Sequence, residues 1–193
     1  SSWSEINTWS MGLLHKQDWK AYWIGLKSQP STCDSSIYKY AARYFRKDVI
    51  IQKRIKSATL YTSGVGFFEC YLNGERLDNH IFNPGFTNYK KEIFYLTYDV
   101  TKKLQVGLNT LGLIVGNGRF SNPDKRQFNI GKSKMICQLN IEYNDGSKET
   151  IISDSCWKLS IDGPITRNSE YDGEIYDARK EMPGWCKPGF DCS

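Results

Sequence analysis

The sequence lacks the features that mark several large classes of protein. It contains only two histidines, His15 and His80, so a zinc site or a Ser-His-Asp triad has few residues to draw on. No apolar run approaches the roughly 20 residues that span a bilayer. The net charge is +5, but no long basic run is present. We therefore expect neither nucleic acid nor membrane as a partner.

The cysteines and the N-terminus bear on the cellular compartment. Residues 1–15 have no basic start and no apolar stretch, so no signal peptide is visible. The chain starts abruptly, as a fragment or a processed form does. Of its six cysteines, Cys70 and Cys137 fall in strand-like runs, where a thiol behaves as a small buried hydrophobe. We expect mostly free thiols, which favours a reducing compartment such as the cytoplasm.

The sequence does contain a series of short strand-like runs separated by Gly, Asn and Asp. Asn73-Gly74 and Asp145-Gly146 each stand between two such runs and predict β-hairpins. Short strands at intervals of roughly 8–12 residues, with few helices, indicate an all-β jelly-roll sandwich over residues 38–180. The runs expected to form strands are 40–49, 55–66, 67–77, 92–101, 108–118, 134–154 and 155–161.

The two ends of the chain flank this predicted sandwich. Residues 1–37 form an N-terminal arm or linker, and residues 181–193 form a C-terminal tail. Residues 11–25 are expected to give a short helix followed by a strand. The arm either packs against its own sheet or a neighbouring domain, or it serves as an aromatic platform for a sugar. Its tryptophans are Trp3, Trp9, Trp19 and Trp23.

Three polar segments follow predicted strands: Leu77–Lys91, Gly116–Phe128 and Ser169–Arg179. Amides, carboxylates and arginine bind sugar hydroxyls, while an aromatic ring stacks under the apolar face of a sugar ring. The same oxygens are ligands that Ca²⁺ accepts. Simple turns and a structural ion pair between Asp177 and Arg179 explain the segments without any ligand. Sugar binding, Ca²⁺ binding and a purely structural role therefore stay open.

Eight residues of these segments are our candidates for sugar contact. Asn and acidic side chains would hold hydroxyls or a cation, the rings would stack, and the arginine would donate hydrogen bonds. We predict that Asn117→Ala abolishes sugar binding without unfolding the domain. No catalytic residue is assigned, because no GxSxG, HExxH or P-loop motif occurs, and no metal ligand is assigned. The eight candidates are Asn83, Phe86, Asn88, Asn117, Arg119, Asp172, Glu174 and Tyr176.

Several motifs in a fixed order resemble one known family. Over roughly residues 38–186 the chain is similar to the N-terminal domain of bacterial α-L-rhamnosidases of glycoside hydrolase family 78. Two departures reduce the aromatic platform of that family: its PGW is Pro84-Gly85-Phe86 here, and its GNGW ends at Arg119. The motifs are LYTSGVGFFECYLNGERL, NPGFTNYKKEIFYLTYDVT, LNTLGLIVGNGRF and SCWKLSIDGPITRNSEYDGEIYDARKEMPGW.

The resemblance implies a sandwich of the galactose-binding-domain type with a non-catalytic role in a larger enzyme that cleaves terminal α-L-rhamnosides. Its partner would be a catalytic (α/α)₆ barrel further along the same polypeptide, beyond residues 181–193. Some relatives of the domain hold L-rhamnose with the help of Ca²⁺.

Three functions follow from these observations. The first is an accessory domain that binds L-rhamnose or rhamnosides, or that completes a wall of the active site. The alternative is a structural scaffold that docks on the catalytic barrel. An independent enzyme ranks last, although 21 acidic residues leave room for a carboxylate pair.

Overall fold

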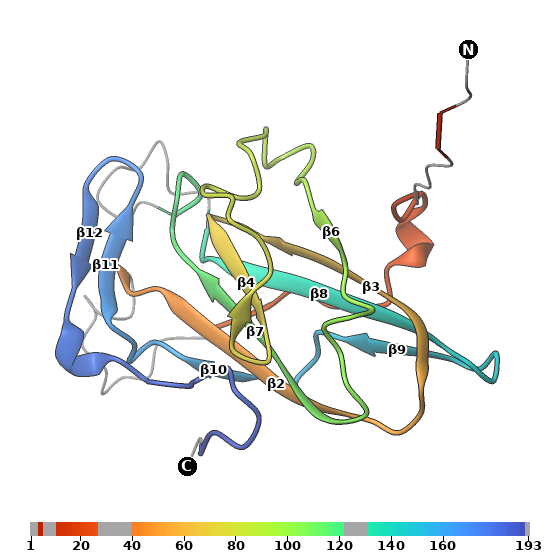
Figure 1. Ribbon diagram of the computed structural model, residues 1–193. Coiled ribbons are helices and arrows are strands. Elements are labelled where there is room, and N and C mark those ends of the chain that lie inside the picture. Colours follow the sequence, from red (N-terminus) through yellow and green to blue (C-terminus); the bar gives the residue numbers. More distant parts are fainter. Residues whose placement is uncertain (1–3, 6–10, 27–39, 122–130, 192–193) are drawn as a thin grey trace.

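The computed structural model shows two antiparallel β-sheets packed face to face (Figure 1). It describes residues 4–5, 11–26, 40–121 and 131–191. The predicted all-β sandwich is confirmed. Within these ranges no helix has the length and apolar character needed to cross a membrane.

The first sheet is built around β3 and β8, which pair over nearly their whole length. Its strand order is β1-β8-β3-β6, and β9 also pairs with β8. The strands are β1 (Ile24–Gly25), β3 (Ile55–Gly64), β6 (Leu96–Asp99), β8 (Lys134–Tyr143) and β9 (Lys148–Ile152).

The second sheet is built around β2 and β7, which pair from Arg43 opposite Val115 to Ile51 opposite Gly107. Its strand order is β10-β2-β7-β4-β5. The strands are β2 (Arg43–Ile51), β4 (Phe68–Leu72), β5 (Glu75–Arg76), β7 (Gly107–Val115) and β10 (Lys158–Ser160).

A separate two-stranded ribbon stands beside the sandwich, on the side opposite the N-terminal segment (Figure 1). It consists of β11 (Ile165–Ser169) and β12 (Gly173–Tyr176). The sequence prediction of strands ended at residue 161 and treated Ser169–Arg179 as a polar loop, which is wrong. Every residue of β12 is exposed, so the ribbon carries no alternation of polar and apolar residues from which a strand is recognised.

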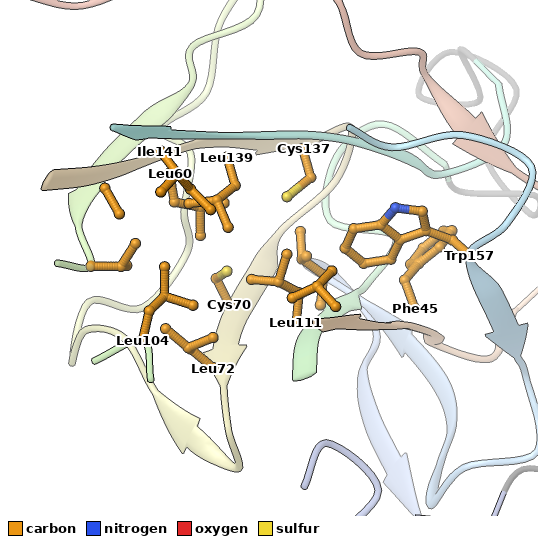
Figure 2. Close-up of a cluster of buried hydrophobic side chains, with 14 of the residues drawn as sticks. Phe45, Leu60, Cys70, Leu72, Leu104, Leu111, Cys137, Leu139, Ile141 and Trp157 are labelled. Atoms are coloured by element: carbon orange, nitrogen blue, oxygen red, sulfur yellow. The ribbon is translucent and has the colours of Figure 1, made fainter. Parts of the chain in front are cut away.

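The core lies between the two sheets (Figure 2). Leu60, Leu139 and Ile141 point into it from the first sheet, and Phe45 and Leu111 from the second. Inward side chains alternate with outward ones along a strand, which is why the half-buried strands were recognisable from the sequence. Burial of this apolar surface is the main contribution to folding.

Both predicted hairpin turns are confirmed. Asn73 and Gly74 have φ angles of 54° and 87°, as a type I′ turn requires. Gly146 has a φ of 82°, and its N–H donates to the Tyr143 carbonyl at 2.9 Å. A three-residue loop with glycine in the left-handed region is the next most common hairpin connection.

The arm and the C-terminal segment both pack on the sandwich. η1 (Lys16–Asp18) precedes β1, as the predicted order of helix and strand requires, and Trp19 packs edge-on against Tyr61 and Tyr95. At the other end, η3 (Ala178–Lys180) leads to Trp185 and Cys186, which cover Gly112 of β7. The expected boundary at residue 37 lies outside the described residues, as do Trp3 and Trp9, so the proposed division into domains stays a prediction.

The cysteine environments make the first testable prediction. Cys70, Cys137, Cys156 and Cys186 are free thiols, as expected, and only Cys156 among these four is exposed. Burial raises the pKa of Cys137 to about 12 and that of Cys186 to about 11. Because the thiolate is the reactive form, we expect iodoacetamide at about pH 8 to alkylate Cys156 and spare the other three.

Peptide mass spectrometry of the alkylated protein checks this expectation. Equal alkylation of Cys137 and Cys156 in folded protein would contradict the described burial. Denatured protein, in which all thiols react, provides the control. Cys33 and Cys192 lie outside the described residues.

Candidate functional site

A cavity of about 570 Å³ opens between the β11–β12 ribbon, the ends of β4 and β7, and the loop that follows β5. Its apolar lining includes Phe82, Ile114 and Ile165. Its polar lining includes Glu69 and Asn168. A hollow of this size, with apolar walls and a few polar groups, is the usual form of a small-ligand site.

A buried asparagine fixes the ribbon to the sandwich at this cavity. Asn117, which follows β7, is 0% exposed. Its Oδ1 accepts hydrogen bonds from Arg43 at 2.5 Å and from Ser133 at 3.2 Å. Its Nδ2 donates to the carbonyls of Tyr40 and Asn168 at 2.9 and 3.0 Å. The side chain therefore joins β2, the residue before β8, and β11 at one point.

This environment corrects the role predicted for Asn117. Both of its side-chain polar atoms are used inside the protein, so neither is available to a sugar hydroxyl. The observation also changes the expected result of Asn117→Ala. Removing the amide would leave its buried hydrogen-bond partners unsatisfied, which lowers the free energy of unfolding.

The loop that contains Gly66 and the loop that contains Gly116 are in backbone contact with each other. A Cβ on Gly66 would lie 2.1 Å from the Gly116 carbonyl oxygen, and the φ of Gly66 is +117°. The Gly116 N–H donates to the Phe67 carbonyl at 2.8 Å. The glycines flanking Asn117 permit a close backbone approach, and the group approached is the Gly66–Phe67 backbone of the same chain. This contact holds Phe67 and Gly116 in the cavity wall.

The three predicted polar segments meet beside the cavity. The guanidinium carbon of Arg119 lies 4.9 Å from the centre of the Phe86 ring and 5.9 Å from that of Tyr171. Its Nε donates to the Glu170 carboxylate, which raises the pKa of the Arg119 guanidinium above its ordinary value. Contacts of a cation with ring faces stabilise such clusters modestly. Arg119 therefore links the ribbon to the loop that carries Phe86.

Phe86 and Arg119, the positions of the two departures, are thus in contact with each other. The Phe86 ring is 58% exposed, and it also meets the Tyr89 ring edge-on at 5.7 Å. The Arg119 side chain remains 36% exposed. Both side chains are accessible to a ligand, although part of the stacking surface of Phe86 is already occupied by the guanidinium.

The loop after β5 is fixed by hydrogen bonds to the second sheet and to Asp78. The Asn83 carbonyl accepts from the Phe68 N–H at 2.7 Å, and the Asn83 side chain donates to Asp78 at 3.4 Å. The Tyr98 hydroxyl donates to the same carboxylate. These contacts position the neighbouring Phe82 in the cavity wall. Asn83 itself is half-buried and is not among the lining residues.

The remaining candidates are spread over the surface. Asn88 is exposed, and its Oδ1 accepts from the Lys90 N–H at 3.2 Å. Asp172 accepts from the Ser169 hydroxyl at 2.7 Å, and Tyr176 donates to Glu181 at 2.8 Å. Glu174 is the one candidate of the eight that lines the cavity. Of the eight predicted residues, Glu174 therefore lines the cavity, and Phe86 and Arg119 lie beside it.

Sequence reasoning missed several residues that line the cavity. Ser169 and Glu170 stand in a segment that was singled out as polar, and Phe82 stands in another, so a signal existed for the region but not for the residues. Glu69 lies within β4, where nothing in the sequence separates it from an ordinary outward strand residue.

The described part of the chain contains no cluster of carboxylates that could bind Ca²⁺. No three His, Cys, Asp or Glu side chains come together there closely enough to share an ion. The predicted pair of Asp177 and Arg179 forms, at 2.8 Å, and it lowers the pKa of Asp177 to about 2. A carboxylate already held by a guanidinium is a poor start for a Ca²⁺ site, which collects 6–8 oxygens.

Comparison with known proteins gives a consistent result. The family model described as the alpha-L-rhamnosidase N-terminal domain matches residues 53–193. An alpha-L-rhamnosidase of Formosa agariphila is 38% identical over 199 residues, which cover 99% of this chain and 21% of that protein. The solved alpha-L-rhamnosidase from Dictyoglumus thermophilum has a TM-score of 0.80 and 42% identity, over 92% of this chain and 20% of that one.

A second solved structure shows a related protein with a sugar. The Streptomyces avermitilis alpha-L-rhamnosidase complexed with L-rhamnose has a TM-score of 0.73 and 35% identity, over 80% of this chain and 15% of that one. This chain spans about a fifth of the length of the Formosa agariphila protein.

Proposed function

Because this chain belongs to the family of α-L-rhamnosidase N-terminal domains, we propose that it is a non-catalytic accessory domain that binds a rhamnose unit in the β11–β12 cavity. The catalytic residues of the enzyme lie, in this proposal, in the part of the polypeptide that corresponds to the remaining length of its relatives. The partners are therefore L-rhamnose or a rhamnoside, and the catalytic domain of the same polypeptide.

The chemistry of the cavity wall is the observation that supports this proposal. L-Rhamnose is a 6-deoxyhexose, so it presents a methyl group as well as hydroxyls. Phe82, Ile114 and Ile165 offer apolar surface for the methyl group and the C–H face of the ring. Glu170 and Glu174 offer carboxylate oxygens, which accept hydrogen bonds from hydroxyls.

Isothermal titration of L-rhamnose into the wild type and two variants tests the proposal. Phe82→Ala removes apolar wall, and Glu174→Gln removes a charged acceptor while keeping the shape. We expect each variant to bind about tenfold more weakly, a loss of about 1.4 kcal/mol. Glu75→Gln serves as a control, because Glu75 is 79% exposed in its side chain and lies in β5, away from the cavity lining.

The outcomes separate the alternatives. Wild-type affinity in both cavity variants would place the sugar elsewhere and contradict the assignment. Titrations with Ca²⁺ and with EDTA should give the same affinity, since the described residues provide no carboxylate cluster for the ion. A requirement for Ca²⁺ would contradict that part of the account.

The exposed apolar side chains at this end favour a second candidate function, docking against a neighbouring domain. Large exposed apolar patches on monomeric proteins mark interaction sites. If folded protein gives no heat of binding with L-rhamnose, the result would support a structural docking role and not a sugar site. The side chains are Ile81, Phe82, Phe86, Tyr171, Ile175 and Tyr176, with exposed fractions of 67, 64, 58, 45, 57 and 52%.

A further inference from the structure

A second cavity, of about 490 Å³, lies between the N-terminal arm and the segment that leads into β6. The arm and the β11–β12 ribbon stand on opposite sides of the molecule (Figure 1), and the two cavities share no lining residue. Four rings line the second cavity: those of Trp19, Trp23, Tyr89 and Tyr95. Neither the rhamnose site nor the packing of the sandwich core makes use of this hollow.

The wall formed by the arm is fixed in place. The Lys20 N–H donates to Gln138 Oε1 at 2.6 Å, and Gln138 Nε2 donates to the Asp18 carbonyl at 3.0 Å. Gln138 is 1% exposed, so these bonds are shielded from water. Further along, the Tyr22 N–H donates to the Ser153 carbonyl at 3.0 Å and the Ser153 hydroxyl donates to the Tyr22 carbonyl at 2.6 Å. The adjoining β1 pairs with β8. A cavity with walls held in this way needs little ordering when a ligand binds.

The two tryptophans of the arm differ in their ring contacts and exposure. Trp19 packs edge-on against Tyr95 and Tyr61, with ring centres 5.4 and 6.5 Å away. Trp23 has no such ring partner among the described residues and is 40% exposed. Exposure of an indole that lines a preformed hollow is typical of a ring that meets a ligand.

The polar groups around these rings match the hydroxyls of a sugar. Lys16 and Lys91 carry ammonium donors, and Glu92 carries carboxylate acceptors. The indole N–H groups of Trp19 and Trp23 donate to no acceptor within the described part of the chain. The Trp19 N–H is not fully buried, and Trp23 is 40% exposed. They are therefore accessible donors beside apolar ring surface.

We propose that this second cavity binds a pyranose ring, with Trp23 stacking on its C–H face and the lysines and Glu92 binding its hydroxyls. The site is independent of the rhamnose site in the β11–β12 cavity. A suitable ring presents only axial hydrogens on its faces, because equatorial hydroxyls then point outward to the polar groups. Methyl β-D-glucopyranoside has this shape and is the probe we choose.

Calorimetric titration of this glucoside into the wild type, Trp23→Ala and Tyr22→Ala tests the inference. Trp23→Ala should weaken binding at least tenfold, because stacking on the indole is lost. Tyr22 is the matched control: it is the adjacent aromatic residue, it is 66% exposed and it does not line the cavity. Tyr22→Ala should keep the wild-type affinity, and the melting temperatures of both variants should match that of the wild type.

Each outcome decides the inference separately from the proposed function. Absence of glucoside binding by folded wild-type protein overturns it, as does wild-type affinity in Trp23→Ala. Glu174→Gln should leave glucoside binding unchanged while it weakens L-rhamnose binding. Loss of glucoside binding in Glu174→Gln would show that the probe occupies the β11–β12 cavity, and it would overturn the second site alone.

Discussion

Replacing Asn117 by alanine should lower the free energy of unfolding by about 3 kcal/mol, because its buried side chain makes four hydrogen bonds whose partners are left behind. Arg43 is the most sensitive of these partners, since it is a charged group only 2% exposed. The loss should appear in urea denaturation as a lower midpoint with an unchanged slope.

Asn88→Ala provides the matched control for this experiment. Asn88 is exposed, and its side chain accepts one hydrogen bond from the Lys90 N–H at 3.2 Å. We expect this variant to stay within about 0.5 kcal/mol of the wild type. If Asn117→Ala were as stable as Asn88→Ala, the asparagine would not be the structural centre described here. Loss of sugar binding in the Asn117 variant would then return it to the predicted set of contact residues.

Replacing Gly66 by alanine should lower the free energy of unfolding by about 3 kcal/mol or more, through strain and collision together. The φ of +117° is unfavourable for any residue with a Cβ, and that atom would lie 2.1 Å from the Gly116 carbonyl oxygen. Because the two loops cannot both keep their positions, we also expect weaker L-rhamnose binding by whatever fraction of the variant remains folded.

Gly146→Ala separates the two causes. Gly146 has a φ of +82°, and a Cβ there would meet nothing within 4 Å. Its replacement should therefore cost only the backbone strain, about 1–2 kcal/mol. Thermal unfolding of both variants gives the comparison. Equal losses at the two positions would show that the Gly66–Gly116 contact is looser than described.

The sandwich was largely predictable because its signals are local. The Asn73-Gly74 turn and the half-buried alternation of β4 depend only on neighbouring residues. The β11–β12 ribbon was missed because its residues are partly or fully exposed on both faces and carry no such alternation. The segment was recognised as polar, but it was predicted to be a loop and not a pair of strands.

The site was less predictable, because it depends on contacts between distant parts of the chain. Phe86, Arg119 and Glu170 come from three segments. Phe86 and Arg119 were both predicted to contact a sugar, but nothing in the sequence indicates that the guanidinium lies on the Phe86 ring and pairs with Glu170. Asn117 was proposed as a sugar contact, but its side chain is buried. A polar residue between two glycines has the same sequence pattern whether its amide faces a ligand or the interior. Its burial follows from the positions of Tyr40 and Asn168, which only the fold reveals.

Chemical-shift mapping would show directly whether the β11–β12 cavity binds a rhamnose unit. L-Rhamnose would be titrated into ¹⁵N-labelled protein while the backbone amide resonances are followed. We expect the largest saturable changes on Phe82, Ser169, Glu170 and Glu174, which line the cavity. An unchanged spectrum of folded protein, or changes confined to the arm around Trp23, would contradict it.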